Sequence, residues 1–313
     1  MLKIIFAGTP EFAAQHLIAL IKSQYVISAV ITKPDKPSGR GNKIIFSAVK
    51  TIAKKYNIPL LQPEKINKTV ELSLYHFHAD VMIVVAYGLI ITETILKMFP
   101  IGCLNIHASL LPRWRGPSPI QSALLQGDTQ TGITIINMDN KIDTGDIIYA
   151  MKCNILKTDN TITLTKKLIQ LGIQSILITL EKISNNTFNY QKQKQCQATY
   201  SKKITKKHAK INWKNDAEIL DRMIRAYNPW PISYFIMNNI QIKILEAKII
   251  KKDITEKKSI GEIISIDCKG INIQTKKNII QIKKIQFPGK KIITVKDFIN
   301  AHKNWFKLGM ILK

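Results

Sequence analysis

The sequence lacks several patterns that would each place the chain in a large functional class. No apolar run approaches the roughly 18 residues needed to span a bilayer, and the densest one, residues 81–91, is followed by Thr92 and Glu93. Pro10 and Glu11 interrupt the first apolar run before the core of a secretory signal could form. The four cysteines are far apart, with no CxxC pair and no zinc-like histidine spacing, so neither a metal site nor a disulfide framework is predicted. We therefore expect a cytoplasmic protein with reduced cysteines.

Glycine-rich phosphate-binding motifs are also missing from the sequence. After the first predicted strand only Gly8 appears at the place where a GxGxxG fingerprint would be needed. A Walker A loop does not occur either. The sequence therefore predicts neither a nicotinamide nor a flavin cofactor, although the chain shows the strand and helix pattern of folds that often bind them.

Acidic residues are scarce relative to basic ones. The chain holds 47 Lys and Arg against 21 Asp and Glu, a formal net charge of +26. Residues 190–313 carry 27 of the basic and 9 of the acidic side chains, and residues 1–189 carry 20 and 12. This asymmetry predicts a polyanionic partner for the C-terminal part, with RNA or DNA ahead of a membrane surface. The abundance of Ile, Lys and Asn leaves a second explanation open, because AT-rich coding produces lysine without any binding role.

The chain is longer than a typical single domain, so we predict two domains. In residues 1–189 short β-like runs alternate with helical stretches, which indicates α/β class: a Rossmann-like, doubly wound, mostly parallel sheet. Residues 190–207 are polar and without apolar periodicity, so a linker is predicted there. After a helical pattern at 216–227, short alternating runs predict a small OB-like β-barrel within a basic second domain, residues 208–313. The strands predicted for the first domain are residues 2–8, 25–32, 81–87, 103–107, 132–138 and 146–155.

A candidate site follows from the strand at 103–107. Asn105 and His107 project from one face of this strand, because side chains repeat every second residue, and they lie at its carboxyl end, where open α/β sheets bind ligands. Asp143 and Asp146 flank a glycine in the next loop between strands and could supply a carboxylate to the same edge. These residues alone also fit a structural role, since a lone histidine at a strand end is often simply hydrogen-bonded.

Longer motifs carry a resemblance to a known family. The chain resembles the folate-dependent formyltransferases in "NIHASLLPRWRG" (105–116), in "DTGD" (143–146) and in the opening "FAGTPEFA" (6–13). Further motifs are similar to the members of that family that act on methionine carried by initiator tRNA. These are "KPDKPSGRG" (33–41), "VVAYGLI" (84–90) and "RAYNPWP" (225–231). The resemblance covers most of the chain.

The resemblance implies a reaction and roles for three residues. A formyl group would pass from 10-formyltetrahydrofolate to the α-amino group of initiator methionyl-tRNA, giving N-formylmethionyl-tRNA for translation initiation. Asn105 and His107 would donate hydrogen bonds to the oxyanion that develops on the formyl oxygen. His107 would also exchange protons near neutral pH, and Asp143 would orient it. No metal is implied, because attachment to the folate nitrogen already activates the formyl group.

Binding residues follow from the same resemblance. The folate is expected against a turn and a strand end made of Ser109, Leu110, Leu111, Pro112, Tyr87, Gly88 and Leu89. The expected tRNA-binding residues are Lys36, Arg40, Lys43, Arg113 and Arg115. Two alternatives remain open for them: the loop at 32–43 fits a solvated surface loop, and the two arginines beside Trp114 fit anchors for their own loop. We expect the protein to act as a monomer.

Two other functions remain open at this point. A folate-dependent formyltransferase acting on an amino sugar nucleotide would share the catalytic core and can carry a similar C-terminal barrel. The "SGRG" loop at 38–41 and the positive charge of the C-terminal half argue against it. A non-catalytic RNA-binding protein with a decayed first domain is the third possibility, and an intact set of Asn105, His107 and Asp143 argues against decay.

Overall fold

The computed structural model describes residues 1–38, 43–251, 258–302 and 305–312. The chain forms two compact units. Unit 1 consists of Met1–Pro119, Gln130–Asn154 and Thr165–Ser201, and unit 2 consists of Ile120–Thr129, Ile155–Leu164 and Lys202–Lys313. The division is therefore interleaved in sequence, whereas the composition of the chain predicts a single boundary. Residues 190–201, predicted as linker, belong to unit 1.

Unit 1 is built on a seven-stranded sheet with the order β5-β2-β1-β6-β7-β8-β9. The first five strands pair in parallel, and β8 and β9 are antiparallel to their neighbours. The predicted mostly parallel α/β sheet is confirmed. The strands are β1 (Lys3–Gly8), β2 (Val26–Ile31), β5 (Leu60–Leu61), β6 (Val81–Val85), β7 (Gly102–His107), β8 (Gln130–Asn137) and β9 (Ile147–Asn154). A short hairpin, β3 (Lys36–Ser38) with β4 (Lys43–Ile45), forms a separate sheet.

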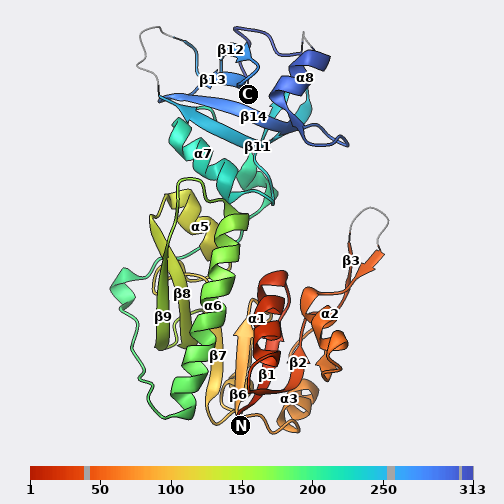
Figure 1. Cartoon of the computed structure of the whole chain (residues 1–313), viewed down its shortest axis with the longest axis vertical. Helices are drawn as coiled ribbons and strands as arrows, with labels where there is room; N and C mark the ends of the chain where they lie inside the picture. Colours follow the sequence, from red (N-terminus) through yellow and green to blue (C-terminus); the bar gives the residue numbers. More distant parts are fainter. Residues whose placement is uncertain (39–42, 252–257, 303–304, 313) are drawn as a thin grey trace. The chain divides into compact units, whose positions relative to one another are not determined.

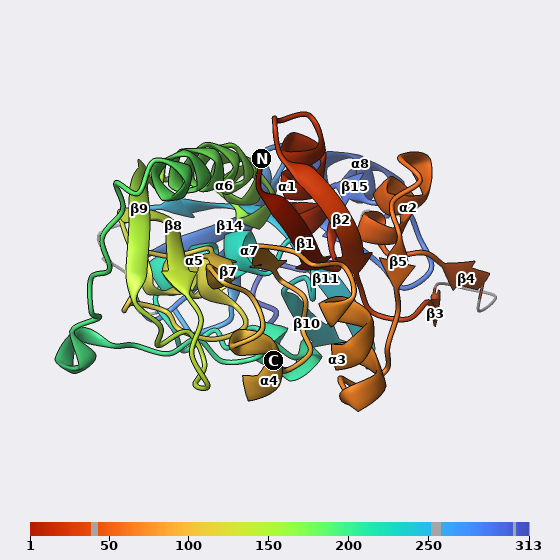
Figure 2. The same cartoon turned by 90° about the horizontal axis from the view of Figure 1, so that it is seen from below.

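Helices cover both faces of this sheet, as Figures 1 and 2 show. In Figure 2, α1 and α6 lie on one face and α3 and α4 on the other. β6 is buried along its whole length, which explains why it reads as an unbroken apolar run instead of an alternating one. Ser47 and Asn67 cap α2 and α3 by accepting backbone N–H groups with their side chains. The helices of unit 1 are α1 (Glu11–Ile21), α2 (Ala48–Lys55), α3 (Lys68–Tyr75), α4 (Glu93–Leu96) and most of α6 (Thr161–Ser184), whereas α5 (Pro119–Gln126) belongs to unit 2 from Ile120 onward.

Unit 2 contains the predicted antiparallel β module. Its sheet has the order β10-β11-β14-β13-β12, with β15 paired to β14, and α7 packs on it with Leu220 and Ile224 in the buried core. Within the described residues no pairing joins β10 to β12, so the strand path is that of an open sheet. The elements are α7 (Ala217–Ala226), β10 (Tyr234–Met237), β11 (Ile240–Ile250), β12 (Ile263–Asp267), β13 (Gly270–Gln274), β14 (Ile279–Gln286), β15 (Ile293–Thr294) and α8 (Val295–Ala301). No helix in the described ranges is long and apolar enough to cross a bilayer.

One buried histidine stands out in the core of unit 1. His16, on α1, is fully buried, and its Nδ1 lies 2.7 Å from the carbonyl oxygen of Phe12. Its Nε2 has no partner among the described residues, and helix α6 passes so close that a Cβ at Gly172 would stand 2.3 Å from it. Desolvation lowers the pKa of His16 from 6.5 to about 4, and the bond to Phe12 only partly opposes this. His16 is therefore neutral in the folded protein.

We expect acid to destabilise the fold through this residue. Between pH 6.5 and about 4 the unfolded chain takes up a proton at His16 that the folded chain excludes. The free energy of unfolding should therefore be insensitive to this group above pH 6.5 and should fall by about 3 kcal/mol as the pH drops to about 4. Urea unfolding across this range measures the loss.

The variant His16→Leu should lose that part of the pH dependence, because leucine does not titrate. His76→Gln, which removes an exposed imidazole, serves as the matched control and should keep it. An unchanged acid dependence in His16→Leu would assign the effect to other groups.

Candidate active site

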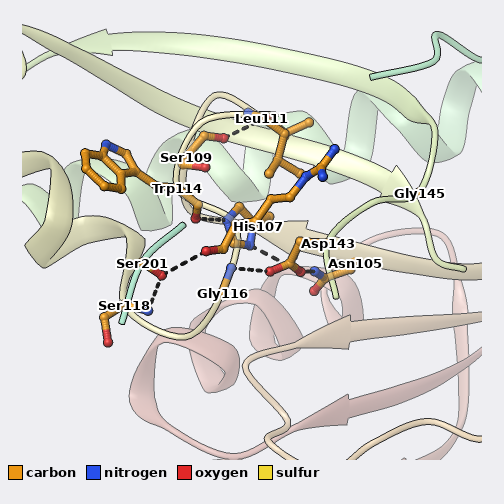
Figure 3. Close-up of polar contacts among 12 residues, drawn as sticks. Asn105, His107, Ser109, Leu111, Trp114, Gly116, Ser118, Asp143, Gly145 and Ser201 are labelled. Atoms are coloured by element: carbon orange, nitrogen blue, oxygen red, sulfur yellow. Dashed lines mark hydrogen bonds and ion pairs between the residues drawn. The ribbon is translucent and has the colours of Figure 1, made fainter. Parts of the chain in front are cut away.

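Strand β7 brings the first two predicted site residues to the carboxyl edge of the sheet. Asn105 pairs with Val84 of β6 and with Ile136 of β8, and His107 is opposite Thr134. The two side chains emerge from the same face, as Figure 3 shows. The period of the strand and the position of its end thus place an amide and an imidazole side by side.

Asp143 completes this group from the loop between β8 and β9. Its Oδ1 accepts a hydrogen bond of 3.2 Å from Asn105 Nδ2 and lies 3.6 Å from His107 Nδ1 (Figure 3). Its Oδ2 accepts the backbone N–H of Gly116 at 2.7 Å. The backbone of Asp143 has φ +54°, a left-handed conformation that costs most residues energy and that Asp tolerates better than most. The structure therefore brings all three predicted residues together.

The surroundings of His107 define how its ring can donate. The side chain is 6% exposed, and Nε2 lies 3.0 Å from the carbonyl oxygen of Trp114. Both ring nitrogens thus face acceptors, the Trp114 carbonyl and the Asp143 carboxylate. A neutral imidazole can donate to only one of them, whereas an imidazolium donates to both. In either form the ring therefore has an acceptor within reach of at least one N–H.

Gly145 allows the loop that carries Asp143 to approach β8. It is buried, and a Cβ built on it would stand 1.8 Å from the carbonyl oxygen of Asn137. Only glycine fits this approach of one backbone to another. Asp146 follows immediately and uses its carbonyl oxygen to accept the N–H of Asn137. These contacts agree with the prediction that Asp143, and not Asp146, supplies the carboxylate.

A segment that the sequence does not mark as functional also reaches this loop. Residues 191–201, which we call the strap, are fixed at one end by two 2.8 Å backbone bonds between Gln191 and Ile147. At the other end, Arg115 N donates to Thr199 O and Arg115 O accepts from Ser201 N. Between these ends the strap contacts the loop, because Gln193 Nε2 donates to the carbonyl oxygens of residues 143 and 145. Its polar composition carries no periodic signal, so the sequence suggests a linker instead.

The turn expected to hold the folate is tightly hydrogen-bonded within the protein. The hydroxyl of Thr134 donates to the carbonyl oxygen of Ser109 at 2.7 Å and accepts the N–H of Leu111 at 3.0 Å. The carbonyl oxygens of Leu110 and Pro112 accept from backbone N–H groups of residues 113 and 199. Two backbone groups of this turn are therefore occupied by Thr134, a residue that the sequence motifs do not mark.

The second expected folate segment follows β6. Tyr87 is 2% exposed in an apolar cluster with α3 and α4, and its hydroxyl has no partner among the described residues. Burial raises the pKa of this phenol. Gly88 is exposed, with φ +78°, and a Cβ there would meet Lys33 Nζ at 2.5 Å. Leu89 is half-buried against the same cluster as Tyr87. The segment therefore presents mainly its glycine backbone to solvent.

Four of the five predicted tRNA-binding residues lie within the described part of the chain. Lys36 is exposed at the start of β3, Lys43 begins β4, and Arg40 lies outside the described residues. The guanidinium of Arg113 lies 4.4 Å from the ring centroid of Trp114. The prediction that Arg115 contacts tRNA is wrong, because its side chain is 1% exposed and is used inside the protein to hold the strap.

The described part of the chain contains no group of three or more His, Cys, Asp or Glu side chains arranged to hold a metal ion. The donors at the site are instead an amide, an imidazole and a single carboxylate. This set is suited to hydrogen bonding and proton transfer.

Comparison with known families matches both parts of the chain. A family model described as "Formyl transferase" matches residues 2–180. A second model, "Formyl transferase, C-terminal domain", matches residues 203–303. The first of these spans more than half of the chain and includes all three residues of the candidate site.

Curated relatives match over almost the whole length. A methionyl-tRNA formyltransferase from Buchnera aphidicola subsp. Schizaphis graminum (strain Sg) is 52% identical over 312 residues, 99% of each chain. Another from Buchnera aphidicola subsp. Baizongia pistaciae (strain Bp) is 49% identical over 307 residues, 97% of this chain and 94% of the relative. Among solved structures, an N-formyltransferase from Helicobacter canadensis in complex with folinic acid and dTDP-3-aminofucose has a TM-score of 0.68 at 21% identity, covering 90% of this chain and 99% of that one. That likeness concerns the fold.

The close approach at Gly145 gives a testable expectation. Gly145→Ala should lower the free energy of unfolding by about 3 kcal/mol, the upper end for overpacked sites, because the new Cβ meets backbone that cannot rotate away. Chemical denaturation measures the loss. Gly289→Ala is the control: its Cβ meets no heavy atom within 4 Å, so only the cost of φ +71°, about 1 kcal/mol, should remain. Equal losses of unfolding free energy in both variants would mean that the close approach of Gly145 to Asn137 does not cause the loss.

Proposed function

The chain belongs to the formyl transferase family, and we propose that it transfers a formyl group from 10-formyltetrahydrofolate to the α-amino group of methionine on initiator tRNA. The product, N-formylmethionyl-tRNA, is used to start translation, and this places the reaction in the cytoplasm. The observation that carries the proposal is the contact of the Asp143 carboxylate with Asn105 and His107 at the carboxyl end of β7. Relatives that share about half of its residues over the full chain carry this activity in their names.

Asn105 supports the proposal through an amide N–H for which the described residues supply no acceptor. When bound, the folate supplies a formyl group on a nitrogen that can leave. One N–H of the Asn105 amide is engaged by Asp143, and a primary amide has two. The second N–H is available to the formyl oxygen, which gains negative charge as the amine attacks. A donor fixed in advance by a carboxylate stabilises that charge without reorganising.

His107 and Asp143 together can move the proton that the reaction releases. The attacking amine must lose a proton and the departing folate nitrogen must gain one, so one group that accepts and returns a proton balances the reaction. The imidazole can accept it, because the Asp143 carboxylate, 3.6 Å from Nδ1, stabilises the charged ring. Asp143 is held in place for this role, since it accepts hydrogen bonds from Asn105 and from the Gly116 N–H.

We assign the binding of the two substrates to the residues that the family resemblance implies. For the folate we keep the turn of residues 109–112 and residues 87–89, with the exposed backbone of Gly88 as a contact in place of the occupied backbone of the turn. For tRNA we keep Lys36, Arg40, Lys43 and Arg113, together with the basic side chains of residues 190–313. Positive charge of this kind fits a phosphate backbone.

Substitution of the two donors tests the catalytic roles. Asn105→Ala should lower kcat by about 100- to 1,000-fold, because it removes a donor that acts on the developing charge. His107→Ala should lower kcat by about 100-fold or more through loss of proton transfer. Formylation of methionyl-tRNA measures both.

The matched controls replace exposed residues of the same types. Asn185→Ala and His76→Ala should keep normal turnover, since both side chains are exposed. Filter binding should show that the two site variants still retain charged tRNA, as expected for groups that act on the transition state. Normal turnover by Asn105→Ala or His107→Ala would contradict the proposed mechanism.

The segment at 32–43 generates a separate expectation for tRNA. Arg40→Ala should raise KM for charged tRNA on the order of 10-fold, with kcat little changed, because one charged contact is lost. The slope of log affinity against log salt should fall by about 1. Lys97→Ala removes an exposed cation that pairs with Glu93 on α4, and it should change neither. A tRNA titration of Arg40→Ala that matches the wild type would show that Arg40 does not contribute to tRNA binding.

The choice of acceptor needs its own assay. The protein is offered charged initiator tRNA, glycinamide ribonucleotide and an amino sugar nucleotide side by side, each with 10-formyltetrahydrofolate. We expect turnover with the tRNA alone. Preferred formylation of the sugar nucleotide would replace the proposed acceptor while leaving the chemistry of Asn105 and His107 in place.

A further inference from the structure

The side chain of Gln193 lies between a buried cation and the loop that carries Asp143. Its Oε1 accepts from Nε of Arg115 at 3.0 Å and from Nη2 at 2.8 Å. Its Nε2 donates to the carbonyl oxygen of Asp143 at 2.9 Å and to that of Gly145 at 2.7 Å. The opposite orientation of the amide would set N–H against N–H and carbonyl against carbonyl, so these four contacts fix the orientation.

The buried guanidinium of Arg115 holds the Gln193 amide in this orientation. Its side chain is 1% exposed, and the partners that the described residues give its guanidinium are all neutral oxygens: Gln193 Oε1, Gln195 Oε1 at 2.8 Å and the Tyr200 hydroxyl at 3.4 Å. A buried cation without hydrogen bonds is costly, so the strap residues that accept from it are held in place. Gln195 and Gln193 share the guanidinium, but only Gln193 continues to the loop.

The loop needs these hydrogen bonds because the backbone of Asp143 has an unfavourable conformation. The two carbonyl groups that Gln193 binds flank Thr144, and the first of them belongs to Asp143, whose φ of +54° is unfavourable. A rotation of this peptide would turn the carboxylate away from Asn105 and away from His107. Displacements of about 1 Å in a reacting group can lower a rate by about 100-fold.

We propose that Gln193 is a positioning residue for formyl transfer: it relays the fixed location of the buried Arg115 to the backbone of Asp143 and so sets the carboxylate against Asn105 and His107. This inference rests on the proposed function, because it assigns Gln193 to the same site. It acts through Asp143, without contact to either substrate.

Three single variants of the full-length protein separate this role from a structural one. Gln193→Glu keeps an oxygen for Arg115, with added charge attraction, but replaces the donor to the two carbonyl groups by an acceptor. Gln193→Ala removes both sets of contacts. Gln195→Ala is the matched control, because it removes a contact to Arg115 and leaves the loop contacts unchanged. Steady-state formylation of methionyl-tRNA gives kcat and both KM values, and thermal unfolding gives Tm.

We expect Gln193→Glu and Gln193→Ala to lower kcat by about 10- to 100-fold, with both KM values within about two-fold of the wild type. Gln195→Ala should keep kcat within about two-fold although it too removes a contact to Arg115 and lowers Tm. Wild-type kcat in the Gln193 variants, or an equal loss of kcat in Gln195→Ala, would overturn the inference and leave the proposed function standing. Absence of turnover in the wild-type protein would overturn the proposed function, and the inference with it.

Discussion

The Asp143 carboxylate is the contact on which the candidate active site depends. It joins its own loop before β9 to strand β7, through Asn105 and His107, and to the turn that follows β7, through the Gly116 N–H. A carboxylate with so little solvent around it requires these partners, since burying charge without hydrogen bonds is expensive. The position of one loop therefore decides whether the amide and the imidazole share an acceptor or stand alone.

Local backbone strain accompanies this arrangement. Asp143 and Trp114 both have positive φ, at +54° and +62°, and Trp114 offers its carbonyl oxygen to His107. Such conformations persist only where surrounding contacts outweigh their cost, and here those contacts come from the strap and from Arg115. The protein thus keeps two strained residues on either side of the imidazole, and uses a buried cation with neutral partners to hold the segment that supports them.

The fold could be predicted from the sequence where local patterns repeat. The apolar runs that predict strands at 103–107 and 132–138 coincide with β7 and β8 to within two residues, because burial of one or both faces imposes the pattern. The short elements β5 and α4 were missed, since two to four residues carry too little periodicity. The assignment of residues 120–129 and 155–164 to unit 2 was missed too, because nothing in a local stretch states which core it will join.

For the site, the sequence by itself determined that Asn105 and His107 face the same way at a strand end, and that a glycine two residues after Asp143 permits a tight turn. These follow from the period of a strand and from the sterics of one residue. Tertiary structure alone decided that Asp143 reaches Asn105 across 38 residues and that Arg115 binds Gln193 across 78. Whether an arginine is exposed to solvent or binds a buried amide depends on which distant segment packs over it. The charge and the spacing of residues along the chain do not predict which segment this is.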